Sequence, residues 1–290
     1  MLLLNASGCL DALTAPEVAR SFDAFVTKTV TPEPREGNPP VRIAETDFGM
    51  LNSIGLANPG RDRFVAENLP ALVRLLGKPV WVSVGGFSAR EYAETCALLD
   101  GRDSVAALEL NLSCPNVDEA PESAAEIVAA CRAATSLPLY AKLSPAAWDI
   151  AEVARAVEAA GADGLSLVNT LRGLALDERL RPSLARSVGG YSGPALKPVA
   201  LAAVYACRRA TGLPIVGMGG VRSGRDALEL IACGATHVAL GTVLFAEPGA
   251  PERIRSELSL ACSSAGFDNT ADAFSAAQEA VFGTGNQHVR

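Results

Sequence analysis

The stretch PIVGMGGVRSGRDALELIACGATHVALGT, residues 214–242, contains a complete strand–helix–strand unit. It begins with a short apolar run that is typical of a buried strand followed by a glycine turn. Ser223 then precedes apolar residues at helical spacing, and Gly234 follows them, as expected for the start and the end of a helix. The apolar run HVALGT completes the unit. The stretch therefore predicts an α/β fold in which strands are joined by helices.

Similar units recur along the chain. Eight expected strands lie in LLLNAS (2–7), AFVTKTV (24–30), PVWVSVG (79–85), ALELNLS (107–113), LPLYAKLS (137–144), GLSLVNT (164–170), PIVGMGG (214–220) and HVALGT (237–242). Helical spacing follows in 88–101, 123–136, 149–164 and 223–237, which open on Ser88, Ser123, Asp149 and Ser223 as candidate N-caps. No compositional break divides the chain. We therefore predict one domain over residues 1–290, a single (β/α)8 TIM barrel with a long active-site insertion at about 31–60.

The composition excludes several classes of function. The 290 residues are 49% hydrophobic with a net charge of −7, so an extended basic surface for nucleic acid or anionic lipid is not expected. Seven cysteines lie far apart without a C-x-x-C pair, which argues against a zinc site or an iron–sulfur cluster in this chain. No 18-residue apolar span or signal peptide is apparent. These features predict a cytoplasmic protein in a reducing compartment, without a membrane segment.

The residues that end the predicted strands are unusual for a barrel of this kind. Active sites in such barrels lie at the carboxyl ends of the strands. Here these ends carry lysines, a cysteine and several amides, with almost no carboxylates. This set suits a planar, anionic, amide-bearing ligand better than a metal or a sugar.

Glycines after the last two strands predict a phosphate cradle. GMGGVRSG (217–224) and GTVLF (241–245) let backbone N–H groups approach a phosphate, at the position where this fold commonly binds one. The alternative is that the glycines only form tight turns. With Lys28 and Lys142 at other strand ends, the cradle favours FMN, because a fixed cation stabilises reduced flavin. For either lysine considered singly, a strand-end side chain that reaches solvent is the favoured interpretation, and it is the combination with the cradle that points to FMN.

Nine segments of the sequence, taken together, resemble those of a known enzyme family. The matching segments are NASG (5–8), TKTVTPEPREGNPPVR (27–42), GMLNSIGLANPG (49–60), ELNLSCPNV (109–117), KLSP (142–145), GADGLSLVNTLRG (161–173), GGYSGPALKPVAL (189–201), GMGGV (217–221) and GT (241–242). Together they resemble the class 1 dihydroorotate dehydrogenases, the cytosolic FMN enzymes of pyrimidine synthesis. The resemblance implies oxidation of dihydroorotate to orotate.

The resemblance also assigns a role to Cys114. In class 1 enzymes the base that removes a proton from the substrate is a cysteine in the SCPN loop, whereas the membrane-associated class 2 uses serine. A thiol is a competent base near neutral pH only when its pKa falls towards 7, which nearby lysines or oriented N–H groups can achieve. The alternative is that Cys114 is one more buried cysteine.

The family's binding residues carry over to matching positions. As FMN contacts the resemblance implies Ala6, Ser7, Lys28, Thr29, Asn111, Lys142, Val168, Gly193, Gly219, Gly220, Gly241 and Thr242. As substrate contacts it implies Lys28, Asn52, Gly55, Leu56, Asn111, Asn116, Asn169 and Thr170. Asparagine both donates and accepts hydrogen bonds, as orotate requires. The alternative for the asparagines is that they cap turns.

The same motifs bear on subclass and partners. They look more like the NAD-linked class 1B type than the fumarate-reducing homodimers. That type implies a homodimer that pairs with a subunit carrying FAD and an iron–sulfur cluster. A shorter segment after Cys114 (117–123) and the added charge of Arg172 depart from the family pattern. Two other hypotheses remain: a flavin enzyme acting on another dihydropyrimidine, whose relatives typically show SCPH, and a catalytically silent flavin-binding barrel.

Overall fold

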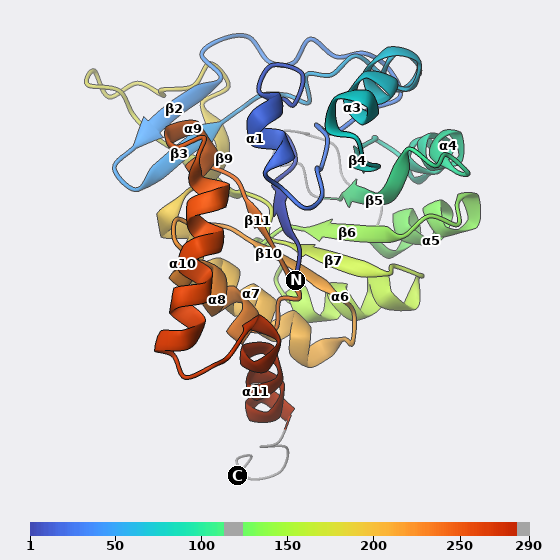
Figure 1. Ribbon diagram of the computed structural model, residues 1–290. Coiled ribbons are helices and arrows are strands. Elements are labelled where there is room, and N and C mark those ends of the chain that lie inside the picture. Colours follow the sequence, from blue (N-terminus) through green and yellow to red (C-terminus); the bar gives the residue numbers. More distant parts are fainter. Residues whose placement is uncertain (113–123, 283–290) are drawn as a thin grey trace.

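A curled parallel sheet forms the centre of the structure, a computed structural model that describes residues 1–112 and 124–282 (Figure 1). Its seven strands run in the order β1-β11-β10-β7-β6-β5-β4, and all neighbours pair in parallel. They are β1 (Leu3–Asn5), β4 (Val80–Val84), β5 (Val105–Asn111), β6 (Leu139–Leu143), β7 (Gly164–Leu167), β10 (Ile215–Met218) and β11 (His237–Leu240). Each lies within a strand expected from the sequence or overlaps it.

The predicted second strand, residues 24–30, is the exception. It is joined to both edges of the sheet, but only by isolated parallel bridges from Ala24 to Leu4, from Val26 to Trp81 and from Val30 to Val84. One reason is local. The Asn5 side chain donates to the carbonyl of Val26 at 2.7 Å and accepts from its N–H at 2.8 Å, so it takes the groups that a strand ladder would use. The prediction of a (β/α)8 barrel is therefore confirmed only in part: the described residues form a curled parallel α/β sheet of seven strands, and the closed eight-stranded barrel stays a prediction.

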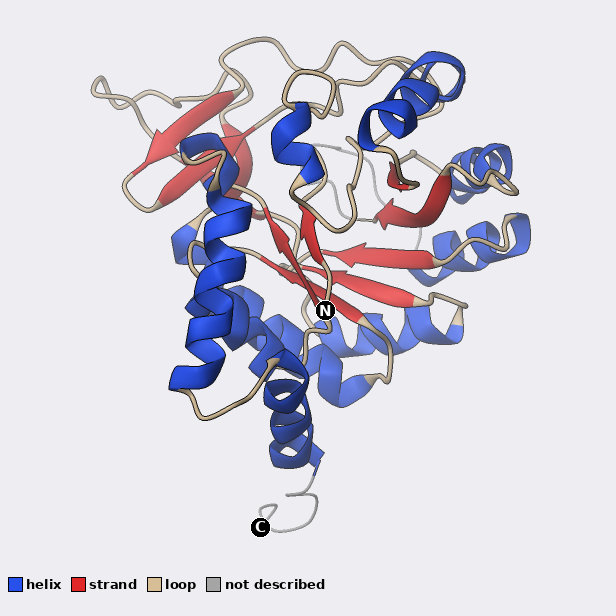
Figure 2. Ribbon diagram, viewed as in Figure 1, coloured by secondary structure: helices blue, strands red, loops and turns tan. Residues whose placement is uncertain are grey.

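Helices surround this sheet on its outer side (Figure 2). They are α1 (Pro16–Arg20), α2 (Arg61–Arg63), α3 (Leu69–Leu76), α4 (Ala89–Leu99), α5 (Ala124–Ala134), α6 (Ile150–Ala159), α7 (Lys197–Ala210), α8 (Gly224–Ala232), α9 (Val243–Ala246), α10 (Ala250–Ser264) and α11 (Thr270–Phe282). A π-helical turn spans Phe64–Asn68 and a 3-10 turn spans Pro194–Leu196. The predicted N-caps Ser88, Asp149 and Ser223 are confirmed, because each side chain accepts a backbone N–H of the first helical turn, whereas Ser123 lies outside the described residues.

Large side chains fill the inside of the curled sheet. Trp81 and Tyr140 pack with their ring centroids 4.4 Å apart, among apolar residues that include Val26 and Val216. A Cβ at Gly164 would lie 2.3 Å from the Tyr140 ring, so a larger residue there would displace it. This plug closes the interior below the strand ends and forms the floor on which a site can be built.

A second, antiparallel sheet was not expected from the sequence. It has the order β2-β3-β9-β8 and contains β2 (Ile43–Thr46), β3 (Gly49–Asn52), β8 (Leu171–Leu174) and β9 (Val188–Ser192). Two of its strands come from the predicted insertion at 31–60. In Figure 1 β2, β3 and β9 lie beside α9. Met50 pairs with Ser192 and Asn52 with Gly190, which brings the insertion against a distant part of the chain.

The described part of the chain has neither a helix suited to cross a membrane nor a cluster suited to hold a metal ion. Within residues 1–112 and 124–282, the helices lack the combined length and apolar character needed to cross a membrane. The same residues contain no group of three or more histidine, cysteine or acidic side chains placed to hold a metal ion.

Candidate active site

A cavity of about 510 Å³ lies at the carboxyl ends of the parallel strands. This volume is within the usual range of about 300–1,000 Å³ for small-molecule sites. All predicted site residues within the described part of the chain line it: Ala6, Ser7, Lys28, Thr29, Asn52, Gly55, Leu56, Asn111, Lys142, Val168, Asn169, Thr170, Gly193, Gly219, Gly220, Gly241 and Thr242. The fold thus brings together residues from most of the length of the chain. Their individual binding roles stay predictions.

Two predicted site residues cannot be placed relative to the cavity. Cys114 and Asn116 lie in 113–123, outside the described residues. The segment follows β5 directly, after Asn111 and Leu112. Cys114, the predicted base, therefore follows in sequence the end of β5, whose last residue Asn111 lines the cavity.

One end of the cavity, which we call the glycine end, is built from backbone. Gly193, Gly219 and Gly220 have φ values of 114°, 117° and 78°, in the region that favours glycine. A Cβ on Gly220 would lie 2.8 Å from the backbone nitrogen of Lys197, and one on Gly193 would lie 2.5 Å from the Cα of Gly49. Neither position has room for a side chain. Main chain therefore forms the wall at this end, as a phosphate cradle requires.

A network of charged residues anchors the loop that follows these glycines. Asp226 accepts the backbone N–H groups of Arg222 and Ser223 at 2.9 and 3.0 Å. Burial tends to raise the pKa of the Asp226 carboxyl, but hydrogen bonds from Lys197, Arg222 and Ser223 outweigh it and lower the pKa. From α10, Arg253 donates to the carbonyl of Arg222 at 3.1 Å. The loop is thus tied to two helices and held in one conformation.

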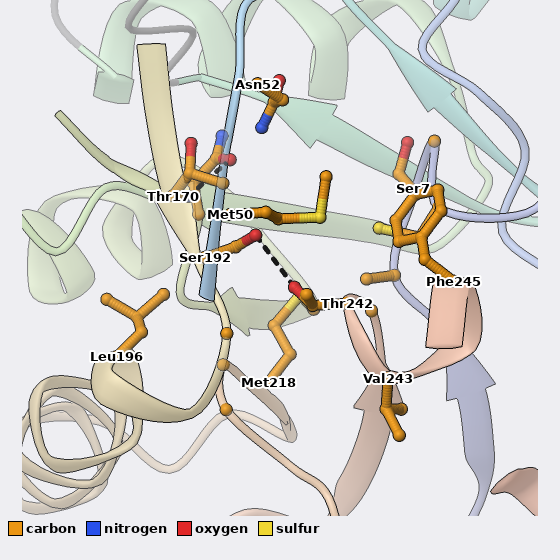
Figure 3. Close-up of a pocket in the computed structure, with 18 of the residues that line it drawn as sticks. Ser7, Met50, Asn52, Thr170, Ser192, Leu196, Met218, Thr242, Val243 and Phe245 are labelled. Carbon is orange, nitrogen blue, oxygen red and sulfur yellow. Dashed lines mark hydrogen bonds between the residues drawn. The ribbon is translucent and has the colours of Figure 1, made fainter. Parts of the chain in front are cut away.

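A hydroxyl pair joins the two sheets at the glycine end. Thr242, at the start of α9, donates to the Ser192 hydroxyl on β9 at 2.8 Å, as Figure 3 shows. Ser192 was missed by sequence reasoning, although it lies inside the motif GGYSGPALKPVAL next to the predicted Gly193. The antiparallel sheet therefore contributes directly to the wall of the cavity.

A chain of amide and hydroxyl groups crosses the cavity at the strand ends. Asn169 donates to the Asn111 side-chain oxygen at 3.0 Å, and Asn111 donates to the Thr29 hydroxyl at 3.4 Å. Thr29 is in turn 3.0 Å from the Ser83 hydroxyl. These contacts link the ends of β7 and β5 to residues 24–30 and β4. Linked amides are held in fixed orientations, which suits recognition of a ligand with ring amide groups.

A buried ion pair lies between β5 and β6, next to this series of hydrogen bonds. Lys142 on β6 lines the cavity, and its Nζ is 3.3 Å from the Glu109 carboxylate on β5. Lys142 is 6% exposed and Glu109 is 1% exposed. Two buried charges at this distance compensate each other, because either one alone would be costly in a dry interior. Glu109 is a carboxylate close to the site that sequence reasoning did not identify.

Cys9 is a thiol at the cavity wall. Burial raises its pKa, the charges of Lys142 and Lys28 partly offset this, and Glu109 adds to the increase. Cys9 therefore remains a protonated thiol near neutral pH. It does not meet the requirement of a lowered pKa that a cysteine base must meet.

The opposite end of the cavity, which we call the mouth, comes from irregular segments and the antiparallel sheet. Asn52 on β3 donates to the Gly190 carbonyl at 3.2 Å. Gly55 and Leu56 follow with φ values of 74° and 57°. Arg35 donates to the Gly55 carbonyl at 3.3 Å, and its guanidinium lies 4.8 Å from the Phe87 ring centroid. The mouth is therefore assembled across long sequence separations.

Further lining residues were missed by sequence reasoning. They include Cys9, Met50, Ser192, Met218, Arg222, Phe245, Glu247 and Arg253. Met218 and Arg222 flank predicted glycines in the motif 217–224, so their proximity could have been read from the sequence. Met50 lies on the antiparallel sheet, and no local pattern indicated that this sheet would reach the cavity.

Comparison with known proteins places the chain in a family. Residues 2–261 match the family model described as dihydroorotate dehydrogenase. A protein of Trichlorobacter lovleyi is 51% identical over 239 residues, covering 80% of this chain and 78% of its own. One from Latilactobacillus sakei is 46% identical over 260 residues (85% and 84%), and one from Listeria monocytogenes is 41% identical over 283 residues (93% and 92%). Each is named the catalytic subunit of dihydroorotate dehydrogenase B (NAD(+)).

The chain therefore belongs to the dihydroorotate dehydrogenase family, as its motifs predict. This family is flavin-dependent.

Proposed function

We propose that this member of the dihydroorotate dehydrogenase family oxidises dihydroorotate to orotate in pyrimidine biosynthesis, with FMN bound in the cavity and Cys114 as the base. The observation that carries the proposal is the convergence of the predicted residues on one cavity. The relatives named above carry this activity in their names. Convergence of so many motif residues from separate strand ends is not expected of a chance resemblance.

The residues present fit FMN. The glycine end offers main chain at Gly193, Gly219 and Gly220, where a Cβ would clash. At Gly241 a Cβ would lie 3.4 Å from Ala6 and from Cys9, so a side chain would occupy the cavity wall. We assign the phosphate to this end and the ring system to the wall formed by Lys142, Asn111 and Val168. When bound, FMN accepts a hydride from the substrate.

The chain's own residues have two tasks in this reaction. Asn52, Asn111, Asn116, Asn169 and Thr170 bind and orient the substrate. Among them the Asn111 and Asn169 side chains are held in place by a hydrogen bond to each other. Cys114, as thiolate, takes the proton from the ring carbon next to the substrate carbonyl, while the neighbouring carbon loses the hydride. The two carbons then share a new double bond, so one proton and one hydride leave for each orotate formed.

The electron acceptor and assembly belong to the same proposal. The motifs and the names of the relatives favour the NAD-linked B type. We therefore propose a cytoplasmic homodimer that passes electrons to a partner subunit carrying FAD and an iron–sulfur cluster. This chain offers no cysteine spacing for such a cluster.

The test is anaerobic and uses the purified 290-residue chain. We expect a flavin spectrum, release of FMN on denaturation, and bleaching by dihydroorotate within one turnover. Adding NAD with an electron-transfer subunit from a B-type relative should restore the colour, whereas fumarate should not. A colourless protein that does not take up FMN would contradict the proposal, as would a flavin that dihydroorotate leaves oxidised. Bleaching by dihydrouracil instead would assign another dihydropyrimidine as substrate.

A further inference from the structure

The pair formed by Glu109 and Lys142 is placed so that only one partner meets the ligand. Lys142 lines the cavity, whereas Glu109 lies behind it and is 1% exposed. In the pairing of β5 with β6, Asn111 is opposite Lys142, and Glu109 is two residues earlier on the same face of β5. The carboxylate therefore approaches the lysine from the closed side of the cavity, at 3.3 Å.

This placement changes what Lys142 can do for a bound flavin. An isolated ammonium at the wall would add a full positive charge and strongly favour the reduced, more negative flavin. A carboxylate in contact with that ammonium cancels most of its field at greater distances, because the two charges act as a dipole. Replacing Lys142 alone would leave the Glu109 carboxylate buried without this partner, so the pair's site would go from neutral to negative, not from positive to neutral.

We propose that Glu109 is a positioning residue that offsets the charge of Lys142 and so sets how strongly the cavity prefers reduced over oxidised flavin. The proposal rests on the proposed function, because it requires FMN to occupy the cavity. Glu109 does not touch the ligand and acts through Lys142. Its carboxylate also fixes the ammonium at one point of the wall.

The test measures the midpoint potential of bound FMN and the dissociation constant of oxidised FMN in four variants. Glu109→Gln removes the charge but keeps the size and a hydrogen-bond acceptor. Lys142→Met removes the cation, and the double variant removes both. Glu152→Gln, on the exposed side of α6, makes the same change in total charge away from the cavity and is the matched control.

The expected pattern is specific to a compensating pair. Glu109→Gln should increase the preference for reduced over oxidised flavin on the order of tenfold, and Lys142→Met should decrease it by a similar factor. The double variant should return to within about twofold of the wild type, since the pair it removes is neutral overall. The control should leave the potential unchanged. A merely structural role for Glu109 would not produce opposite shifts that cancel.

Two outcomes would overturn the inference: an unchanged potential in Glu109→Gln, or a double variant whose potential is as low as that of Lys142→Met. If Glu109→Gln does not fold, the double variant decides. If Glu109 did not offset Lys142 in the wild type, removing both residues would lower the flavin potential below that of the wild type, as removing Lys142 alone does. Failure of the proposed function looks different. It would appear in the wild type itself, as absence of flavin or as no reduction by dihydroorotate.

Discussion

The glycine end and the mouth of the cavity are built in opposite ways. The glycine end is formed mainly by main chain from neighbouring strand–helix units, with Gly219 and Gly220 after β10 and Gly241 after β11. The mouth is formed by side chains that meet across long separations, as when Asn52 contacts Gly190, 138 residues away. The first construction tolerates few substitutions because backbone has no spare room. In the second, a side chain such as that of Asn52 can be shortened without moving the main chain.

This difference predicts which property each variant will change. Changes at the glycine end should alter flavin binding and stability, and leave substrate affinity in the remaining holoenzyme close to normal. Changes at the mouth should alter turnover or substrate affinity while flavin stays bound. A variant that moves both properties together would show that the two ends are coupled.

The largest effect is expected from Cys114→Ser. A serine hydroxyl is a far weaker base than a thiol with a lowered pKa, so flavin reduction by dihydroorotate should slow by about 10²-fold or more at neutral pH. The protein should remain yellow. Stopped-flow absorbance under anaerobic conditions measures the rate. Cys233→Ser, at the end of α8, is the matched control and should reduce at the normal rate. Equal rates in the two variants would remove Cys114 from the mechanism.

Gly220→Ala should have the next largest effect, at the glycine end. The new Cβ would lie 2.8 Å from the Lys197 nitrogen, at a φ of 78° that alanine rarely adopts. Such strain typically costs about 1–3 kcal/mol, which corresponds to a loss of roughly 5- to 150-fold in FMN affinity. Fluorescence titration of the apoprotein with FMN measures it. Gly249→Ala, where nothing lies within 4 Å of the added Cβ, should bind FMN normally.

Asp226→Asn should reveal a pH dependence at the same end. The folded-state pKa of Asp226 is below its ordinary value of 3.8, so its contribution to stability is present above that pH and is lost as the pH falls through the folded value. The variant should be less stable by about 1–2 kcal/mol at pH 5–7, as for loss of a helix cap. This gap should narrow below pH 4. Urea unfolding of both proteins at several pH values tests it, and a gap that widens in acid would contradict the assignment.

The smallest effect is expected from Asn52→Ala at the mouth. Loss of one amide that contacts substrate should raise the KM for dihydroorotate by about tenfold, the size of one hydrogen bond. The dissociation constant for FMN should not change. Steady-state kinetics together with FMN titration separate the two quantities. Weakened FMN binding with an unchanged KM would place Asn52 with the glycine end and break the distinction.

Local patterns explain how much of this could be predicted. Apolar runs bounded by turns identified every strand of the parallel sheet, and Ser88, Asp149 and Ser223 marked helix starts, because these signals lie within a few residues of sequence. The antiparallel sheet could not be found this way. It pairs residues 50–52 with 190–192, and such pairing forms only where the fold brings these distant segments together.

The candidate site shows the same division between residues found from local motifs and residues found only from long-range contacts. Motifs located the lysines, amides and glycines that line the cavity, but not the partner of Lys142. Glu109 appears in the sequence as a polar residue in a buried strand, and only the lateral pairing of β5 with β6 reveals that its carboxylate lies beside the ammonium. Ser192 was overlooked for a similar reason, since its contact with Thr242 crosses from one sheet to the other.

The interrupted pairing of residues 24–30 should be visible in amide hydrogen exchange. Amide protons in a continuous ladder exchange slowly with solvent, whereas those of Val26, held by the Asn5 side chain, and of Val30, held by one bond to the Ser83 carbonyl, are released by small local openings. Val26 and Val30 should therefore take up deuterium sooner than the amides of β5 and β6. Lys28 and Thr29 lie between them, so a ligand bound to this wall should slow that uptake. Exchange at a few amides would then report occupancy of the cavity without any measurement of turnover.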